Sequence, residues 1–347
     1  MPVLDDSEFL TPGDAIMRRE AIFLLVPALA LAIVFAAAAA DLKRGVTDPA
    51  DAGPDFKVQG EYVGESQAKD GKKKKYGAQV IALGDGKFHV VGYAGGLPGE
   101  GWDKSEKDQV DGKTVDGVPT FSIEKDHIIL KIKDGVLTVT KDGKEQVGLL
   151  KKVERKSPTL GAKPPAGAVV LFDGTTPDAF KGGRMTEDKL LMEGVTSKDN
   201  FGSCTLHMEF MTPFKPHARG QGRGNSGFYA QGRYEVQILD SFGLEGKDNE
   251  CGGIYSIGPP AVNMCFPPLS WQTYDVDFTA AEWKEGKKVK NARMTVRHNG
   301  VLIHDDVELP KTTTAAPVKE NDQPGPVYLQ NHGNPVRFRN IWVKEKK

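Results

Sequence analysis

Hydrophobic and polar residues alternate along one stretch in the second half of the chain. In order, the residues are Arg233, Tyr234, Glu235, Val236, Gln237 and Ile238. A two-residue period is typical of a β-strand, whose successive side chains point to opposite faces of a sheet. The pattern therefore predicts a strand with one apolar face towards a core. On its other face a cation, a carboxylate and an amide follow one another at spacings of about 7 Å.

A glycine-rich run, residues 219–224, precedes this strand. Glycine lets the backbone approach a ligand closely, and loops beside a rigid sheet often carry binding residues. A solvated sheet face would also explain an Arg/Glu pair, but the glycines favour a ligand site. No helix and no βαβ unit follows the run, which excludes a nucleotide-binding loop.

The first half of the chain predicts a small antiparallel β domain over residues 57–155. Short alternating segments are separated by Asp-Gly pairs at 134–135 and 142–143, the strongest short-range signal for hairpins. The flanking segments 41–56 and 156–164 are rich in Gly, Pro and Ala and are predicted to be linkers. A loop at 95–102 ends on Trp102, which could contact either a sugar or the neighbouring domain.

Residues 165–347 predict a larger β domain. Alternating segments are found at 169–174, 204–211, 272–278, 293–297, 301–304, 327–330 and 336–343. In the segment 204–211, His207 and Glu209 are expected on the outer face. No helical pattern exceeds two or three turns. So many short strands in about 180 residues predict an all-β fold, a jelly-roll-like sandwich of two sheets.

Composition narrows the functional classes. The formal net charge of −1 argues against a nucleic-acid partner. Three cysteines are too few for a disulfide scaffold, although Cys251 and Cys265 could close a loop; three buried thiols would fit equally well. The chain contains no HExxH, no paired CxxC and no GxSxG motif, so neither a zinc site nor a serine hydrolase is indicated.

The N-terminal region predicts export. Residues 17–40 have a basic start, an apolar run and an alanine-rich end, which are the parts of a secretory signal peptide. We expect cleavage near Ala40 and a periplasmic or secreted protein. An uncleaved anchor at residues 1–40 is the alternative, and only that version would attach the protein to a membrane.

A second group of polar residues lies near the C-terminus. Its members within ten positions are Gln330, Asn331, His332, Asn334, Arg337 and Arg339. His332 stands at a break between two strands, where a turn can present a side chain to a ligand. Together with Asn225 and the polar face at 233–237, this group suits a polyhydroxyl ligand. Trp271, Tyr274 and Tyr229 could stack on it, or could simply pack in the core.

Several ordered motifs carry a family resemblance. They are LFDG at 171–174, GNSGFY at 224–229, GRYEVQILDS at 232–241, WQTYD at 271–275, HNGV at 298–301 and LQNHGNPVRFRNIW at 329–342. The region 165–347 resembles the 3-keto-disaccharide hydrolase domain family, which includes 3-keto-glucoside 1,2-lyases and 3-keto-2-hydroxyglucal hydratases. The resemblance implies a concanavalin-like jelly roll, residence outside the cytoplasm, and oxidised glycosides as substrates. The segment 249–255 lacks the family's His before Cys251, and Asn331 replaces an expected Asp.

These residues suggest a mechanism. A ketone at C3 acidifies the C2 proton, so a base can remove it and the oxygen on C1 then leaves by β-elimination. The enzyme is then a lyase, or a hydrolase if the net reaction is hydrolysis. His332 is the first candidate for the base, and Glu235 is the alternative or orients His332. Arg233, Gln237 and Asn225 are expected to hold the sugar or stabilise the enolate. Further candidate substrate contacts are Gln330, Asn331, Trp271 and Arg337.

Other hypotheses stay open at this point. The sequence identifies no cofactor with certainty, and a divalent metal ion between Glu235 and His332 is an open alternative. A non-catalytic carbohydrate-binding module would use the same sandwich and polar face. An ordinary glycoside hydrolase needs two carboxylates across the bond, and Glu235 and Asp240 fall on opposite strand faces.

Overall fold

The computed structural model describes residues 45–67 and 71–346, and nearly all of its regular structure is β-strand. The predicted signal or anchor segment at 1–40 lies outside these residues. Within the described ranges, no helix is long and apolar enough to cross a membrane. The helical elements are short: η1 (Pro49–Asp51), α2 (Gly53–Val58), η2 (Glu124–Asp126) and η3 (Gly220–Gly222).

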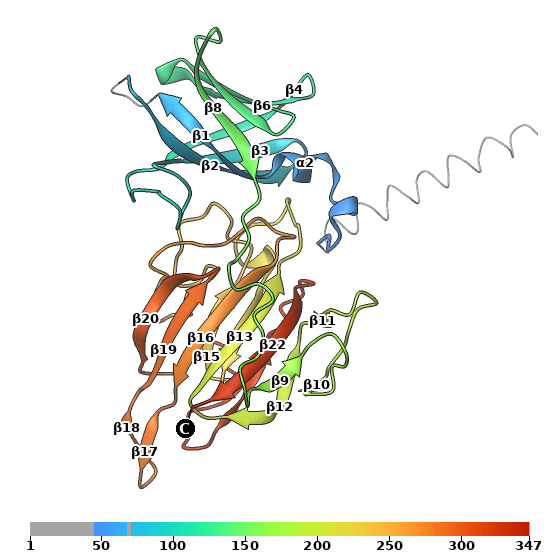
Figure 1. Cartoon of the computed structure of the whole chain (residues 1–347), viewed down its shortest axis with the longest axis vertical. Coiled ribbons are helices and arrows are strands. Elements are labelled where there is room, and N and C mark those ends of the chain that lie inside the picture. The colour runs from blue at the N-terminus through green and yellow to red at the C-terminus, as the bar shows by residue number, and fades with distance from the viewer. Residues whose placement is uncertain (1–44, 68–70, 347) are drawn as a thin grey trace, which may run out of the picture. The chain divides into compact units, whose positions relative to one another are not determined.

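Eight consecutive strands close into an antiparallel barrel, in which each pairs with the next and the last pairs with the first (Figure 1). They are β1 (Gly60–Gln67), β2 (Lys73–Gly84), β3 (Lys87–Ala94), β4 (Asp108–Val115), β5 (Val118–Ile123), β6 (Ile128–Lys133), β7 (Val136–Lys141) and β8 (Glu145–Val153). The Asp-Gly pair at 134–135 turns β6 into β7 with positive φ angles of 49° and 73°. Such angles match the twist of a tight hairpin, which confirms the predicted small β domain.

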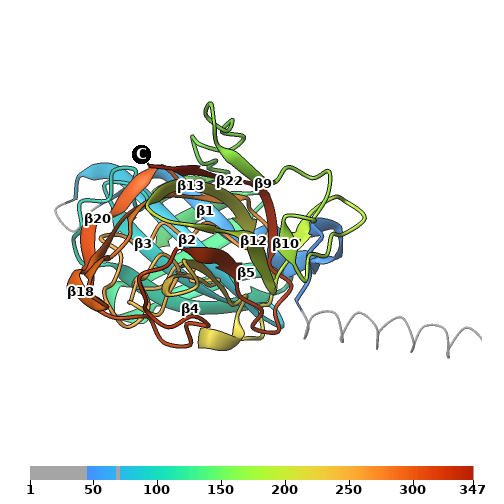
Figure 2. The same cartoon turned by 90° about the horizontal axis from the view of Figure 1, so that it is seen from below.

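The second half is a sandwich of two antiparallel sheets (Figures 1 and 2). The five-stranded sheet, in spatial order, is β10 (Phe180–Lys181), β12 (Val195–Phe201), β21 (Gly325–Leu329), β14 (Ser226–Ala230) and β15 (Tyr234–Ile238). The seven-stranded sheet is β11 (Leu191–Met192), β22 (Arg337–Glu345), β13 (Cys204–Met211), β16 (Gln272–Thr279), β19 (Ala292–His298) and β20 (Val301–Leu309), with β9 (Val169–Phe172) also on β22. A hairpin, β17 (Glu282–Lys284) and β18 (Lys287–Lys290), completes the set. The predicted all-β fold class is confirmed.

The core between the sheets comes from the strand faces that the alternation predicts. From β13 it takes Leu206, Met208 and Phe210, and from β15 it takes Tyr234, Val236 and Ile238. Burying each such side chain stabilises the fold by about 1.5–3 kcal/mol. The opposite faces of these two strands are therefore the outer faces of the sandwich.

The barrel and the sandwich share contacts around Trp102. Its ring packs at 5.3 Å from that of Tyr93, and the ammonium of Lys107 lies over both rings. Lys107 also pairs with Glu245 of the sandwich at 2.8 Å. Within the loop at 95–102, Gly99 lies against Met264 and Val301 of the sandwich, where an added Cβ would be 2.5 Å from the Met264 sulfur. The loop therefore contacts the neighbouring domain, the second of the two alternatives.

The segment predicted as the first linker, 41–56, carries regular structure in its described part. Asp48 caps η1 by accepting a hydrogen bond from Ala50, and Pro49 occupies the first helical turn, where its missing N–H is harmless. Phe56 packs edge-on against Phe214 of the sandwich at 5.3 Å. Composition indicated a linker here because it contains no information about these tertiary contacts.

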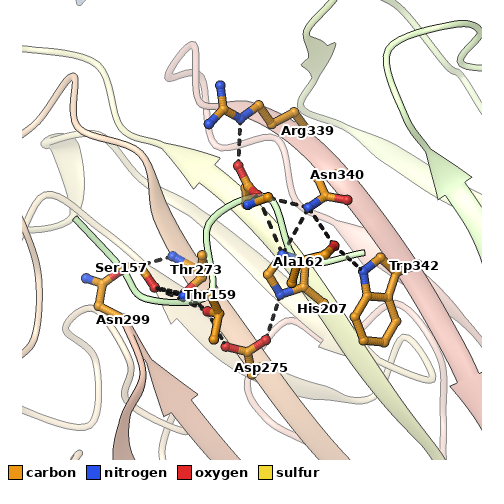
Figure 3. A network of polar contacts seen from close by, with 12 residues as sticks. Ser157, Thr159, Ala162, His207, Thr273, Asp275, Asn299, Arg339, Asn340 and Trp342 are labelled. Carbon is orange, nitrogen blue, oxygen red and sulfur yellow. Dashed lines mark hydrogen bonds and ion pairs between the residues drawn. The ribbon is translucent and has the colours of Figure 1, made fainter. Parts of the chain in front are cut away.

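The second linker, 156–164, lies against the outer face of the seven-stranded sheet (Figure 3). The Thr159 hydroxyl donates to Asp275 at 2.7 Å, and the Gly161 N–H donates to Glu209 at 2.5 Å. Beneath it, His207 contacts Asp275 through Nδ1 at 2.6 Å. His207 and Glu209 do face outwards as predicted, yet both are buried because this segment covers them.

The stability of the fold is expected to depend on pH through His207, which this segment covers. Burial by itself lowers the pKa of His207, but its hydrogen bonds with Asp275 and Glu209 outweigh burial and raise the pKa above the ordinary 6.5. Because the folded-state pKa is raised, the contribution is fully present below pH 6.5 and is lost as pH rises through the folded-state pKa. Denaturant unfolding at several pH values should show wild type losing stability relative to His207→Gln above pH 6.5. A stability difference between them that stays constant with pH would contradict this assignment.

Candidate active site

Two rows of outward side chains cross the five-stranded sheet, set by the strand register. In the first row, Tyr229 of β14 lies opposite Glu235 of β15 and Tyr328 of β21. In the second row, Gly227 lies opposite Gln237, and its carbonyl accepts a hydrogen bond from the N–H of Gln330. The face therefore gathers one carboxylate, two tyrosines and two amides from three neighbouring strands.

Glu235 is the electrostatic centre of this face. Its residue is only 3% exposed, and burial raises the pKa of its carboxyl to about 7, although a hydrogen bond with Tyr229 partly offsets the rise. The carboxylate leans over Gly227, where an added Cβ would lie 2.2 Å from Oε1. A carboxyl that titrates near neutrality can both accept and return a proton at physiological pH.

Tyr229 links Glu235 to Gln330. The Gln330 amide donates to the Tyr229 hydroxyl at 3.0 Å, and burial raises the pKa of Tyr229 well above its ordinary 10. The phenol therefore keeps its proton and donates to the Glu235 carboxylate. The Tyr328 ring lies 5.3 Å from the Tyr229 ring and is partly exposed, so it offers an aromatic surface beside the carboxylate.

Two amides beside this row hold unpaired oxygens. Asn225 donates to the carbonyl of Gln221 at 2.9 Å, and Gln237 donates to the side-chain oxygen of Gln221 at 3.0 Å. A backbone carbonyl only accepts, which fixes the orientation of the Asn225 amide. Asn225 Oδ1 and Gln237 Oε1 are left buried without a protein partner. Buried acceptors of this kind suit hydroxyl donors of a ligand.

Three of the predicted site residues lie elsewhere. Arg233 donates to Gln231, Asn321 and the carbonyls of Lys319 and Gln323, so it fastens the segment before β21. Trp271 lies on the seven-stranded sheet, where the Arg339 guanidinium covers its ring at 4.0 Å from the ring centroid. Arg337, also from that sheet, pairs with Glu193 at 2.9 Å. Alternation and proximity in sequence did not reveal these partners, because they come from distant segments.

His332 and Asn331 lie in the exposed loop between β21 and β22. Asn331 Oδ1 accepts a hydrogen bond from Gly333, and the His332 carbonyl accepts one from Asn334. The loop thus uses local contacts to shape itself, while Gln330 is the residue of this segment that reaches Tyr229. Its position makes His332 a weaker candidate for the base than Glu235.

Two residues of this face were not among the sequence candidates. Gln221 lies in the glycine-rich run, and only its amide side chain distinguished it from the other residues there. Tyr328 alternates with Val327 and Leu329, two core residues, and that alternation was a usable signal for an outward aromatic.

Among the residues that the structure describes, no group of three or more His, Cys, Asp or Glu side chains could hold a metal ion. Glu235 is bonded to Tyr229. The face itself offers carboxyl, phenol and amide groups.

Comparison with known proteins shows which domain family the second half of the chain matches. The profile of the 3-keto-alpha-glucoside-1,2-lyase-like domain matches residues 167–344, just over half of the chain. A crystal structure titled "putative glycosyl hydrolase" from Parabacteroides distasonis is 32% identical, covering 52% of this chain and 85% of its own, with a TM-score of 0.48. A second with that title and organism is 19% identical, covering 52% and 94%, with a TM-score of 0.39. No curated protein matches the sequence.

Proposed function

The chain belongs to the 3-keto-alpha-glucoside-1,2-lyase-like domain family, and from that premise we propose that it cleaves 3-keto-glucosides by elimination, with Glu235 as the base. The observation that carries the proposal is the burial of the Glu235 carboxyl opposite Tyr229 on the outer face of the five-stranded sheet, which raises the pKa of this carboxyl to about 7. Groups with strongly shifted pKa values cluster at functional sites, because proton transfer at neutral pH requires them.

The reaction begins at C2. The ketone at C3 acidifies the C2 proton, which the Glu235 carboxylate removes, and the electron pair moves to the C3 oxygen as an enolate. The enolate then reforms the ketone while the C1–O bond breaks, giving a C1–C2 double bond. The departing oxygen takes a proton, so the substrate loses the aglycone alcohol without an oxidant or a reductant. Tyr229 donates to the Glu235 carboxylate and is itself held by the Gln330 amide, so these two residues orient the base.

The composition of the three strands beneath the site favours this reaction over ordinary glycoside hydrolysis. Hydrolysis by the common mechanisms uses two carboxyl groups about 5–9.5 Å apart. Strands β14, β15 and β21 contain a single carboxylate, Glu235. Asp240, the nearest acidic residue along the chain, is instead paired with Arg223 at 2.7 Å.

A binding module without activity is the competing function. A module that only binds sugar gains nothing from a buried carboxyl whose ionisation near pH 7 costs stability. The unpaired oxygens of Asn225 and Gln237 would serve either function, because both require hydroxyl recognition. Turnover therefore decides between them.

The test compares a 3-keto-glucoside with its unoxidised parent in deuterated water. We expect consumption of the 3-keto compound alone, and deuterium at C2 of any product that has been rehydrated across C1 and C2. Parallel reactions with a chelator show whether a metal ion contributes. Consumption of the unoxidised glucoside, or a saturated cleavage product of the 3-keto compound that carries no deuterium at C2, would refute the elimination. Binding without cleavage would establish the module.

A further inference from the structure

The glycine-rich loop before β14 is attached to the barrel. Arg219 donates to the carbonyl of Leu83 at 3.1 Å, and Arg223 donates to the carbonyl of Ala82 at 3.2 Å. Both acceptors lie near the end of β2 in the barrel. Beside them, an added Cβ on Gly84 would lie 2.3 Å from the His217 imidazole, so this ring packs directly on the Gly84 backbone.

Arg223 is held on its other side by the end of β15. Its Nε pairs with the buried carboxylate of Asp240 at 2.7 Å, and the N–H of Asp240 donates to the Arg223 carbonyl at 3.1 Å. A guanidinium that is bonded on two sides fixes the loop in one place, because its donors have a rigid fork geometry. The loop is thus fixed between β2 of the barrel and β15 of the sandwich.

Gln221 lies between these two arginines and points to the amides of the site. Its Nε2 donates to the Asn249 carbonyl at 2.7 Å, which orients the side chain. Its Oε1 then accepts hydrogen bonds from Asn225 at 2.9 Å and from Gln237 at 3.0 Å. Both amide nitrogens are consequently turned towards Gln221, and each amide oxygen points away from it.

We infer that Gln221 is a positioning residue that presents the oxygens of Asn225 and Gln237 to two hydroxyl groups of a sugar. The barrel takes part in substrate binding, because it holds the loop that carries Gln221. The ligand class is a glycosyl unit with free hydroxyls on the side that faces this loop. This inference rests on the proposed function for the identity of the sugar, but not on the elimination step.

Binding is measured in a Glu235→Gln background, which removes the base and keeps the sugar intact. Calorimetric titrations use one 3-keto-glucoside and its analogues that lack a single hydroxyl. We expect Gln221→Ala to raise Kd about tenfold, which corresponds to about 1.4 kcal/mol. The parent should bind at least one deoxy analogue more weakly than the full sugar, and Gln221→Ala should lose that difference. A merely structural role would leave the deoxy difference unchanged.

The attachment to the barrel is tested with Arg219→Ala, which is exposed and leaves no buried charge. We expect Arg219→Ala to raise Kd for the same sugars, but by less than Gln221→Ala does. Arg297→Ala is the matched control, since Arg297 is an exposed arginine on β19 of the other sheet, and it should leave Kd unchanged. A Kd within twofold of the parent for Gln221→Ala, or an unchanged deoxy difference, would overturn the inference.

Turnover by the wild-type protein keeps the two proposals distinguishable. If wild type binds the 3-keto-glucoside without cleaving it, the proposed function fails, while the Kd series still decides the role of Gln221. If the parent shows no saturable binding of any of these sugars, the inference about Gln221 is wrong.

Discussion

Replacing Glu235 by Gln is expected to lower kcat/KM for a 3-keto-glucoside by about 100- to 10,000-fold, the usual effect of losing a general base. The amide keeps the size of the side chain but cannot accept the C2 proton. The fold should persist, because Tyr234, Val236 and Ile238 of the same strand hold the core. Steady-state kinetics and circular dichroism measure the two effects.

A second variant displaces the Glu235 side chain without replacing it. In Gly227→Ala the new methyl group would lie 2.2 Å from Glu235 Oε1, so the carboxylate must move. We expect a loss of activity in the same direction with little change in stability, since the end of a flexible side chain yields easily. His332→Ala is the comparison, and its exposed position predicts a much smaller loss. A large loss in His332→Ala with an active Glu235→Gln would reverse the assignment of the base.

The raised pKa of Glu235 has opposite consequences for activity and stability. A base must be ionised, so kcat/KM should rise with pH through about 7. The folded-state pKa lies above the ordinary 4.5, so the folded protein binds more protons than the unfolded chain between these values and loses stability as pH rises. Glu235→Gln should therefore be more stable than wild type above pH 7, by up to about 3 kcal/mol. A stability difference between Glu235→Gln and wild type that is the same at pH 5 and pH 8 would contradict the shift.

Breaking the buried pair of Arg223 and Asp240 should cause the largest loss of stability. Arg223→Met leaves the Asp240 carboxylate buried without its 2.7 Å partner. Removing one partner of a buried ion pair typically costs about 3–5 kcal/mol. The change also removes the Arg223 contact with Ala82 of the barrel, so the loop should loosen. Denaturant unfolding measures the free energy.

The double variant Arg223→Met/Asp240→Asn is the control for this pair. This variant lacks the guanidinium as well, but it also replaces the buried carboxylate by a neutral amide. It should therefore recover much of the stability lost in the single variant. If the single and double variants are equally destabilised, the loss comes from packing around Arg223 and not from an unpaired carboxylate.

The strands and their facing directions were predictable from sequence, because they depend on local periodicity. The β13 segment alternates strictly, and the structure buries Leu206, Met208 and Phe210 as that alternation predicts. Asn299-Gly300 marks a hairpin for the same reason, since both residues adopt the positive φ that a tight turn needs. The motifs also identified the family, because a run of ordered short sequences is independent of how the chain packs.

The site was only half predictable. Glu235 and Gln237 share a sheet face through the two-residue period, and Asn225 lies in the adjoining motif. His332 was favoured as the base because imidazole ordinarily titrates near neutrality. We favour Glu235 instead, because burial raises the pKa of its carboxyl to about 7 whereas His332 stays exposed. The kinetics of the two variants decide between them. Burial is a property of the packed sheet and of the segments that cover it.

Sequence by itself therefore determined the strand pattern, the two β regions and the family, all of which follow from neighbouring residues. Tertiary structure decided which polar side chains meet. Gln221, Gln237 and Gln330 are separated along the chain and converge only through sheet register and the loop fixed by the barrel. It also placed Trp271 on the opposite sheet and closed the 156–164 segment over His207. These outcomes depend on contacts between distant segments, which no local pattern encodes.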